Sequence, residues 1–99
     1  MTLEEFNNSV NDAARPPSGL RRALQALWWD AKGDWDRAHQ AAQEDAGAAG
    51  AWAHAYLHRK EGDDSNAGYW YSRAGKPGAS GPLDAERDAI AQVLLASDA

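Results

Sequence analysis

Glycine spacing is the feature that most constrains the fold of this chain. A series of glycines recurs about every fourteen residues, at Gly19, Gly33, Gly47, Gly62 and Gly75. Two of them begin the same phrase, Gly-Asp-x-x-x-Ala, so that the sequence repeats itself after 29 residues. Glycine adopts the left-handed conformation that ends helices, and an aspartate just after it can cap the next helix. The spacing therefore predicts helices of about three turns joined by tight turns.

Capping signals and hydrophobic spacing then place the individual helices. Thr2 and Glu5 form a capping box for a short first helix near residues 3–10. Two prolines within residues 11–18 predict a linker after it, because proline removes a backbone donor and disfavours a helical residue before it. Later helices are expected over residues 18–32 with Ser18 as the cap, from Asp34 to a turn at 47–50, and over residues 51–61, 64–74 and 83–96.

The resulting prediction is an all-α chain built from two antiparallel helical hairpins. Residues 1–17 are expected to form the N-terminal helix with its proline-containing linker, and residues 18–99 a single repeat-like domain. The final helix is expected to be a lid over the last hairpin, since a helical stack needs a cap at its exposed hydrophobic end.

Charge and composition exclude several functional classes. The formal net charge is −5, and the basic residues are scattered along the chain, which argues against nucleic acid as a partner. The chain has no cysteine, and its acidic N-terminus lacks the basic and then apolar pattern of a signal peptide. Its apolar stretches are far shorter than the ~20 residues of a membrane helix. We therefore expect a cytoplasmic protein that binds neither nucleic acid nor a membrane.

The two halves of the chain also resemble a known family. Alanine lies seven residues before and five residues after each turn glycine, at Ala26, Ala38, Ala55 and Ala67. The phrase Ala-x-x-Trp-Tyr-x-x-Ala at residues 67–74 resembles the heart of Sel1-like repeats. Over residues 20–75 the chain is thus similar to tetratricopeptide and Sel1-like helical-hairpin repeats, with a shorter period and only two units. The whole sequence is also similar to short bacterial proteins without an assigned activity.

The resemblance implies a protein-interaction or adaptor module. In such repeats the first helix of each pair lines a concave binding surface, which here would carry Trp29 and His58, with His54 and Tyr69 nearby. A protein or peptide partner would be recognised there by aromatic faces and titratable nitrogens. Two alternatives remain: the tryptophan pair at 28–29 packs as core and rim, or leftover aromatic surface produces a homodimer.

A second hypothesis is a metal- or small-ligand-binding protein. His54 and His58 are one helical turn apart, and Glu61 extends the same face, opposite the face of Trp52 and Tyr56. Such a pair suits zinc or nickel. A third ligand would come from Glu61, from His39 on the preceding helix, or from an acid such as Asp30, although the periodicity turns His39 toward water. The alternative is a solvated or packing histidine pair.

No catalytic arrangement is indicated, and no catalytic residue is assigned. The histidine spacing lacks the glutamate of a His-Glu-x-x-His protease. The serines lie in caps, loops or ordinary helix positions, without the strand-turn-helix context of a nucleophile. The glycine-rich residues 75–81 lack the lysine and serine of a phosphate loop. Nothing in the sequence favours an enzyme over a binding protein.

Overall fold

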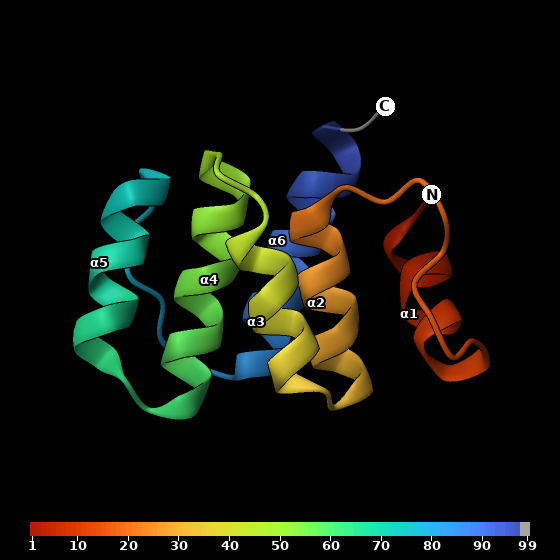
Figure 1. Ribbon diagram of the computed structural model, residues 1–99, viewed down its shortest axis with the longest axis horizontal. Helices are drawn as coiled ribbons and strands as arrows, with labels where there is room; N and C mark the ends of the chain where they lie inside the picture. The colour runs from red at the N-terminus through yellow and green to blue at the C-terminus, as the bar shows by residue number, and fades with distance from the viewer. Residues whose placement is uncertain (98–99) are drawn as a thin grey trace.

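The computed structural model describes residues 1–97, and this part of the chain contains helices and no strands, as predicted. The helices are α1 (Leu3–Asp12), α2 (Arg22–Lys32), α3 (Trp35–Gln43), α4 (Ala48–Glu61), α5 (Asp64–Ala74) and α6 (Leu83–Ser97). Figure 1 shows α1 and α5 at opposite ends of the molecule, with α2, α3 and α4 between them and α6 behind. Within the described residues, no helix is long and apolar enough to cross a membrane.

The repeated Gly-Asp phrase forms the same turn twice. Gly33 ends α2 with φ 92°, and Gly62 ends α4 with φ 90°. The next residue caps the following helix in both cases: Asp34 accepts from the backbone N–H of Arg37 at 3.0 Å, and Asp63 accepts from that of Asn66 at 3.2 Å. Only glycine reaches such φ values without strain, so the sequence repeat is a repeat of turn geometry. Each turn pairs two helices, α2 with α3 and α4 with α5.

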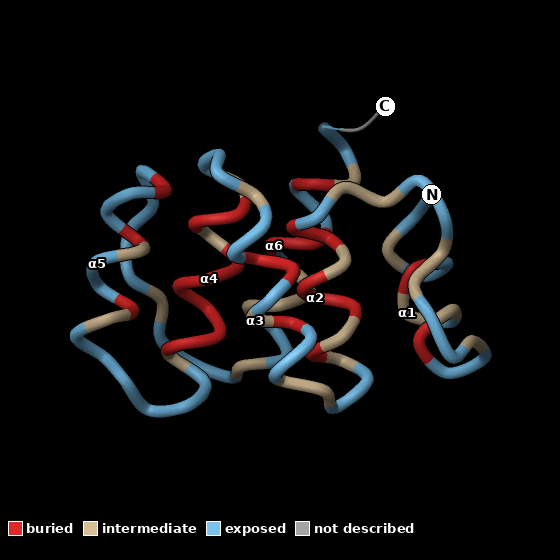
Figure 2. Tube along the Cα trace, viewed as in Figure 1, coloured by how far each residue is buried: buried red, intermediate tan, exposed pale blue. Residues whose placement is uncertain are grey.

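The core is centred on α2 and α4. Its largest fully buried side chains are Trp28, Tyr56, Phe6, Leu24, Leu27, Leu57 and Ile90. Every residue from 53 to 58 on α4 is buried, and Figure 2 shows this helix coloured as buried over most of its length. Because α3, α5, α2 and α6 all pack against α4, it has no solvent face in its middle turns. His54 and His58 are therefore both buried, which excludes the solvated pair among the alternatives that the sequence left open.

Two helix starts differ from the prediction. Helix α2 begins at Arg22 and not at Ser18, because Gly19 has φ 87°, which no right-handed helix accommodates. Helix α4 begins at Ala48 and not near Ala51, and Gly47, at φ −87°, is its N-cap and not a left-handed turn residue. Gly50 lies inside α4, where a Cβ atom would be 2.1 Å from the backbone oxygen of Asp45. This glycine is explained by close approach of the chain.

The two terminal helices are part of the same packed body. Phe6 of α1 is 1% exposed, and Trp28 Nε1 on α2 donates to Ser9 Oγ at 3.0 Å. Lys32 Nζ donates to the carbonyl of Val10 at 2.7 Å. Helix α6 lies against α4, α2 and α1, so it is not simply a lid over the α4–α5 pair. Its main link to α5 is a hydrogen bond from Tyr71 Oη to Glu86.

Candidate metal centre

The three histidines of the chain meet in one cluster. His39 comes from α3, and His54 and His58 come from α4. One ligating nitrogen from each ring can be chosen so that all three lie within 4.8 Å of one another. His54 Nε2 and His39 Nε2 are 2.9 Å apart and share a hydrogen bond. The structure thus brings together all three histidines that the sequence had named as ligand candidates.

Local helix geometry explains why these rings converge. His54 and His58 are four residues apart and lie one above the other on α4, with ring centroids 4.8 Å apart. Helix α3 packs against α4, and its buried residues Ala38, Ala41 and Ala42 are small. Since the distance between packed helices depends on the side chains at the contact, these alanines allow α3 to carry His39 up to the pair. The expected solvent-facing position of His39 is corrected: it is half-buried.

His58 has two ring nitrogens in different environments. Its Nδ1 lies 2.7 Å from Glu61 Oε2, so Nδ1–H donates to the carboxylate. Its Nε2 is buried and has no hydrogen-bond partner, in a side chain that is only 6% exposed. A buried polar atom without a partner costs about 1–3 kcal/mol. Carboxylates commonly support metal-binding histidines in this way, which leaves the other nitrogen as the ligand. Glu61 is thus bonded to His58 and does not join the three converging histidine nitrogens.

Two tryptophan rings pack against the histidine cluster and form its walls. The ring of Trp35 stacks on His39 with centroids 4.8 Å apart, and the ring of Trp70 stacks on His54 at 3.9 Å. Trp35 is also fixed in place, because its Nε1 donates to the carbonyl of Leu57 at 3.2 Å. Neither tryptophan was predicted to lie beside the histidines, although Trp35 and His39 have the four-residue spacing of neighbours on a helix face. Trp70 is recognisable only once α5 is placed against α4.

Burial favours the neutral form of two of the three imidazoles, those of His54 and His39. Burial, together with the nearby rings of His39 and His58, lowers the pKa of His54 from 6.5 to about 4. Burial, and then the charge of His58, also lowers the pKa of His39 below its usual value. Neutral imidazole is the form that binds metal ions. His39 and His54 therefore need not lose an imidazolium proton first, but one of the two rings donates in their shared Nε2–Nε2 hydrogen bond and would have to change tautomer before both Nε2 atoms could bind an ion.

Asp30 does not join the histidines. This carboxylate on α2 is 2% exposed and accepts hydrogen bonds from Tyr56 Oη at 2.6 Å and Lys60 Nζ at 2.7 Å. Arg87 Nη1 of α6 lies 3.7 Å from Asp30 Oδ2, the oxygen that also accepts from Tyr56. Burial and the bond to Asp30 raise the pKa of Tyr56 well above its ordinary value. Asp30 thus serves a separate network that joins α2, α4 and α6.

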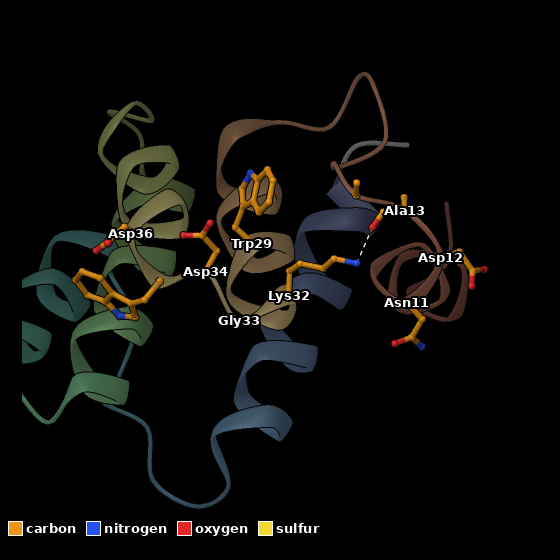
Figure 3. A pocket seen from close by; sticks show the side chains of 10 residues that line it. Asn11, Asp12, Ala13, Trp29, Lys32, Gly33, Asp34 and Asp36 are labelled. Atoms are coloured by element: carbon orange, nitrogen blue, oxygen red, sulfur yellow. Dashed lines mark hydrogen bonds between the residues drawn. The ribbon is translucent and has the colours of Figure 1, made fainter.

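Trp29 also lies apart from the histidines. Its ring packs against the guanidinium of Arg37, 4.6 Å from the ring centroid. Arg37 and His39 are two residues apart on α3 and so point about 200° apart around it. Trp29 lines a cavity of about 700 Å³ between α1 and the α2–α3 turn. Figure 3 shows side chains of this lining, with Asp12 on α1 and Trp29 and Lys32 on α2. The polar part of the lining includes Lys32 and three acids, Asp12, Asp34 and Asp36.

Tyr69 lies at the outer edge of the cluster. It is 54% exposed, and its ring meets Trp70 edge-on with centroids 5.2 Å apart. The guanidinium of Arg73 lies 5.8 Å from the Tyr69 ring centroid and 5.3 Å from that of Trp70. Since Trp70 in turn stacks on His54, Tyr69 reaches the histidines through one intervening ring. The predicted surface of Trp29, His54, His58 and Tyr69 is thus divided between two places in the fold.

Comparison of the chain with protein-family models, curated proteins and solved structures found no match.

Proposed function

We propose that this protein binds a transition-metal ion through His39, His54 and His58. The observation that carries the proposal is the buried Nε2 of His58, which has no partner although two other imidazoles lie beside it. An ion between the three rings would satisfy this atom. Zinc binds histidine nitrogen at about 2.0–2.1 Å, which places tetrahedral ligands about 3.4 Å apart. Ring shifts on the order of 1 Å would bring the three nitrogens to that spacing.

The chemistry of the cluster supports zinc or nickel. Imidazole suits both ions, and neither requires a sulfur ligand. The carboxylate bonded to His58 and the two stacked tryptophan rings would hold imidazole ligands in fixed orientations. The closed packing of α3 on α4 also means that binding would stabilise the folded chain, because the unfolded chain cannot present all three rings together.

Metal titration of the purified chain tests this proposal. Calorimetry is expected to show one Zn²⁺ or Ni²⁺ per chain. At a free metal concentration 100 times the dissociation constant, the folded state gains about 2.7 kcal/mol. For a chain of this length, that corresponds to a rise in melting temperature of roughly 10–20 °C.

Two variants separate the site from nonspecific binding. His58→Gln removes the ligand whose environment carries the proposal, and its affinity is expected to fall by more than about 100-fold, beyond the loss from an outer partner. Trp29→Ala serves as the matched control, since Trp29 packs against Arg37 on another face of α3. Equal affinity in His58→Gln and in the unaltered chain would contradict the metal site.

A second proposal is that the chain is also an interaction module of the repeat type. It is supported by the matching turns of the two helix pairs and by the cavity beside Trp29, whose acidic lining suits a basic peptide. We accordingly propose a distant relationship to tetratricopeptide and Sel1-like repeats. The partner class is a protein or peptide, with self-association into a homodimer as the alternative outcome.

Peptide binding tests the second proposal separately from the first. A fluorescently labelled lysine-rich peptide is expected to bind the chain, and Asp34→Asn with Asp36→Asn is expected to weaken it. Light scattering on the same sample reports whether the chain forms a dimer. Equal binding by the double variant would exclude the cavity as the peptide site, and it would leave the metal proposal untouched.

A further inference from the structure

The histidine cluster supplies three ligands, while zinc sites have four. Structural zinc sites fill all four positions with protein groups, whereas reactive sites use three and leave the last to water or substrate. Among the described residues, the group that can converge on an ion consists of the three histidines alone. The nature of the fourth ligand therefore depends on whether a nearby acid is free to move in.

Glu61, three residues after His58, is already bonded to that histidine. Its Oε2 accepts from His58 Nδ1 at 2.7 Å. The two nitrogens of an imidazole point away from each other, so a carboxylate bonded to Nδ1 lies on the opposite side of the ring from an ion on Nε2. To ligate the ion, Glu61 would have to release His58 and pass around its ring. Its present position favours a role behind the ligand.

Asp30, the other acid that the sequence offered as a ligand, also has partners already. It holds Tyr56 and Lys60 by hydrogen bonds of 2.6 and 2.7 Å, and it is almost fully buried in that network. Moving it would leave the ammonium of Lys60 and the guanidinium of Arg87 without their buried counter-charge. Breaking a buried ion pair in this way costs about 3–5 kcal/mol.

Charge balance indicates what kind of ligand the remaining position would take. Three neutral imidazoles leave the full double charge on a divalent ion, and Glu61 offsets one unit of it from behind His58. The site is largely closed, since His54 and His58 are 5% and 6% exposed. An uncompensated charge is costly in such surroundings. A small anion is therefore favoured over a neutral ligand, and the half-buried His39 marks the more open side.

We propose that a metal ion held by His39, His54 and His58 keeps an exchangeable fourth position that binds a small anion from solution. Hydroxide, a carboxylate or a similar ligand fits this description. The inference rests on the proposed metal-binding function and deepens it: the protein would present a reactive ion rather than a closed structural one. The tryptophan walls would limit the ligand to a small size.

Cobalt substitution with an azide titration tests the inference. Co²⁺ is loaded onto the full chain, and its visible absorption reports coordination while azide is added. We expect a saturable spectral change with one azide per cobalt, both in the unaltered chain and in Glu61→Gln measured at saturating Co²⁺. Circular dichroism checks that the variant is folded, and acetate, tested as a competitor, is expected to reverse the change.

Three results would overturn the inference. A cobalt spectrum that ignores azide would show a position already filled. A response confined to Glu61→Gln would show that Glu61 is itself the fourth ligand. Failure of Co²⁺, Zn²⁺ and Ni²⁺ to bind at all would overturn the metal site and this inference with it, whereas binding without an azide response would overturn the inference alone.

Discussion

The hydrogen bond between His58 and Glu61 decides which nitrogen of His58 is free to bind an ion. In a neutral imidazole one nitrogen carries the proton and the other accepts, and the hydrogen bond of the first selects the tautomer. With Nδ1 donating to Glu61, the lone pair is on Nε2, which is the atom enclosed by the cluster. Glu61 therefore orients His58, and it would support this ring as a ligand of the proposed ion from the opposite side.

Replacing Glu61 is expected to weaken metal binding without abolishing it. Glu61→Gln keeps an oxygen that can accept from Nδ1 but removes the negative charge, and partners of this kind contribute about 10–100-fold in metal affinity. We expect a value near the lower limit for Gln and near the upper limit for Ala, measured by competition with a chromophoric chelator. Glu4→Gln on α1 makes the same charge change elsewhere. Unchanged affinity in Glu61→Ala would exclude the supporting role.

At this scale, the sequence revealed some members of the cluster and missed others. The four-residue spacing of His54 and His58 is visible in the sequence, because it depends only on helix periodicity. The position of His39 depends on how closely α3 packs on α4, and periodicity alone turned it toward water. The sequence could not distinguish whether Glu61 would bind an ion itself or support His58. A carboxylate three residues after the histidine has the same helical spacing in both roles.

At the scale of the element, α4 shows why a glycine pattern predicts the left-handed turns between helices better than it predicts where the next helix begins. Gly33 and Gly62 end their helices in the left-handed conformation, as the repeat predicted. Gly47 and Gly50 lack positive φ values, and the second lies within the first turn of α4. It is required because the chain at Asp45 folds back onto it, a contact that no local pattern encodes.

Alanine substitutions in two helical glycines are expected to have opposite effects. In Gly50→Ala the new Cβ would meet the backbone of Asp45, and overpacking of this kind costs roughly 1–3 kcal/mol. In Gly68→Ala on α5 nothing lies within 4 Å, so the better helix propensity of alanine adds up to about 1 kcal/mol. Urea denaturation measures both. Stabilisation by Gly50→Ala would disprove the close contact at Asp45.

At the scale of the molecule, one buried carboxylate joins three helices. Asp30 of α2 contacts Tyr56 and Lys60 of α4 and faces Arg87 of α6. A second bridge lies beside it, where Arg59 of α4 donates to Glu86 Oε1 at 2.8 Å. These bonds explain the side of α4 on which α6 packs. The sequence shows each charge but gives no means of pairing them, because the partners are between 26 residues (Asp30 and Tyr56) and 57 residues (Asp30 and Arg87) apart.

Neutralising Asp30 is expected to destabilise the whole fold. Asp30→Asn keeps the shape and a hydrogen bond to Tyr56, but it leaves two cations facing a neutral group. Loss of a buried partner costs about 3–5 kcal/mol, and we expect the lower limit because the Lys60 side chain is partly exposed and can turn to water. Glu44→Gln, which removes an exposed pair with Arg22, should change stability by less than about 1 kcal/mol. Similar losses in both variants would contradict the importance of the buried network.

The histidine cluster also makes stability of the metal-free molecule depend on pH. The folded pKa of His54 is about 4, below its ordinary value of 6.5. As pH falls from 6.5 toward 4, the unfolded chain binds a proton that the folded chain does not. The free energy of unfolding therefore decreases over this window, by up to about 3 kcal/mol from His54. His39 contributes in the same direction, since burial also lowers its pKa.

The free energy of unfolding is therefore expected to vary less steeply with pH in His54→Gln than in the unaltered chain. The glutamine cannot titrate, so the metal-free variant should lose about 3 kcal/mol less between pH 7 and pH 4, whatever its stability at neutral pH. Carboxylates contribute equally to both proteins and cancel in the comparison. Adding Zn²⁺ should steepen the dependence of the unaltered chain alone, because protons compete with the ion for the same nitrogens. Urea denaturation at a series of pH values measures all three curves. Parallel curves for the two metal-free proteins would show that His54 is protonated as readily in the fold as outside it, and would remove the neutral cluster on which metal binding depends.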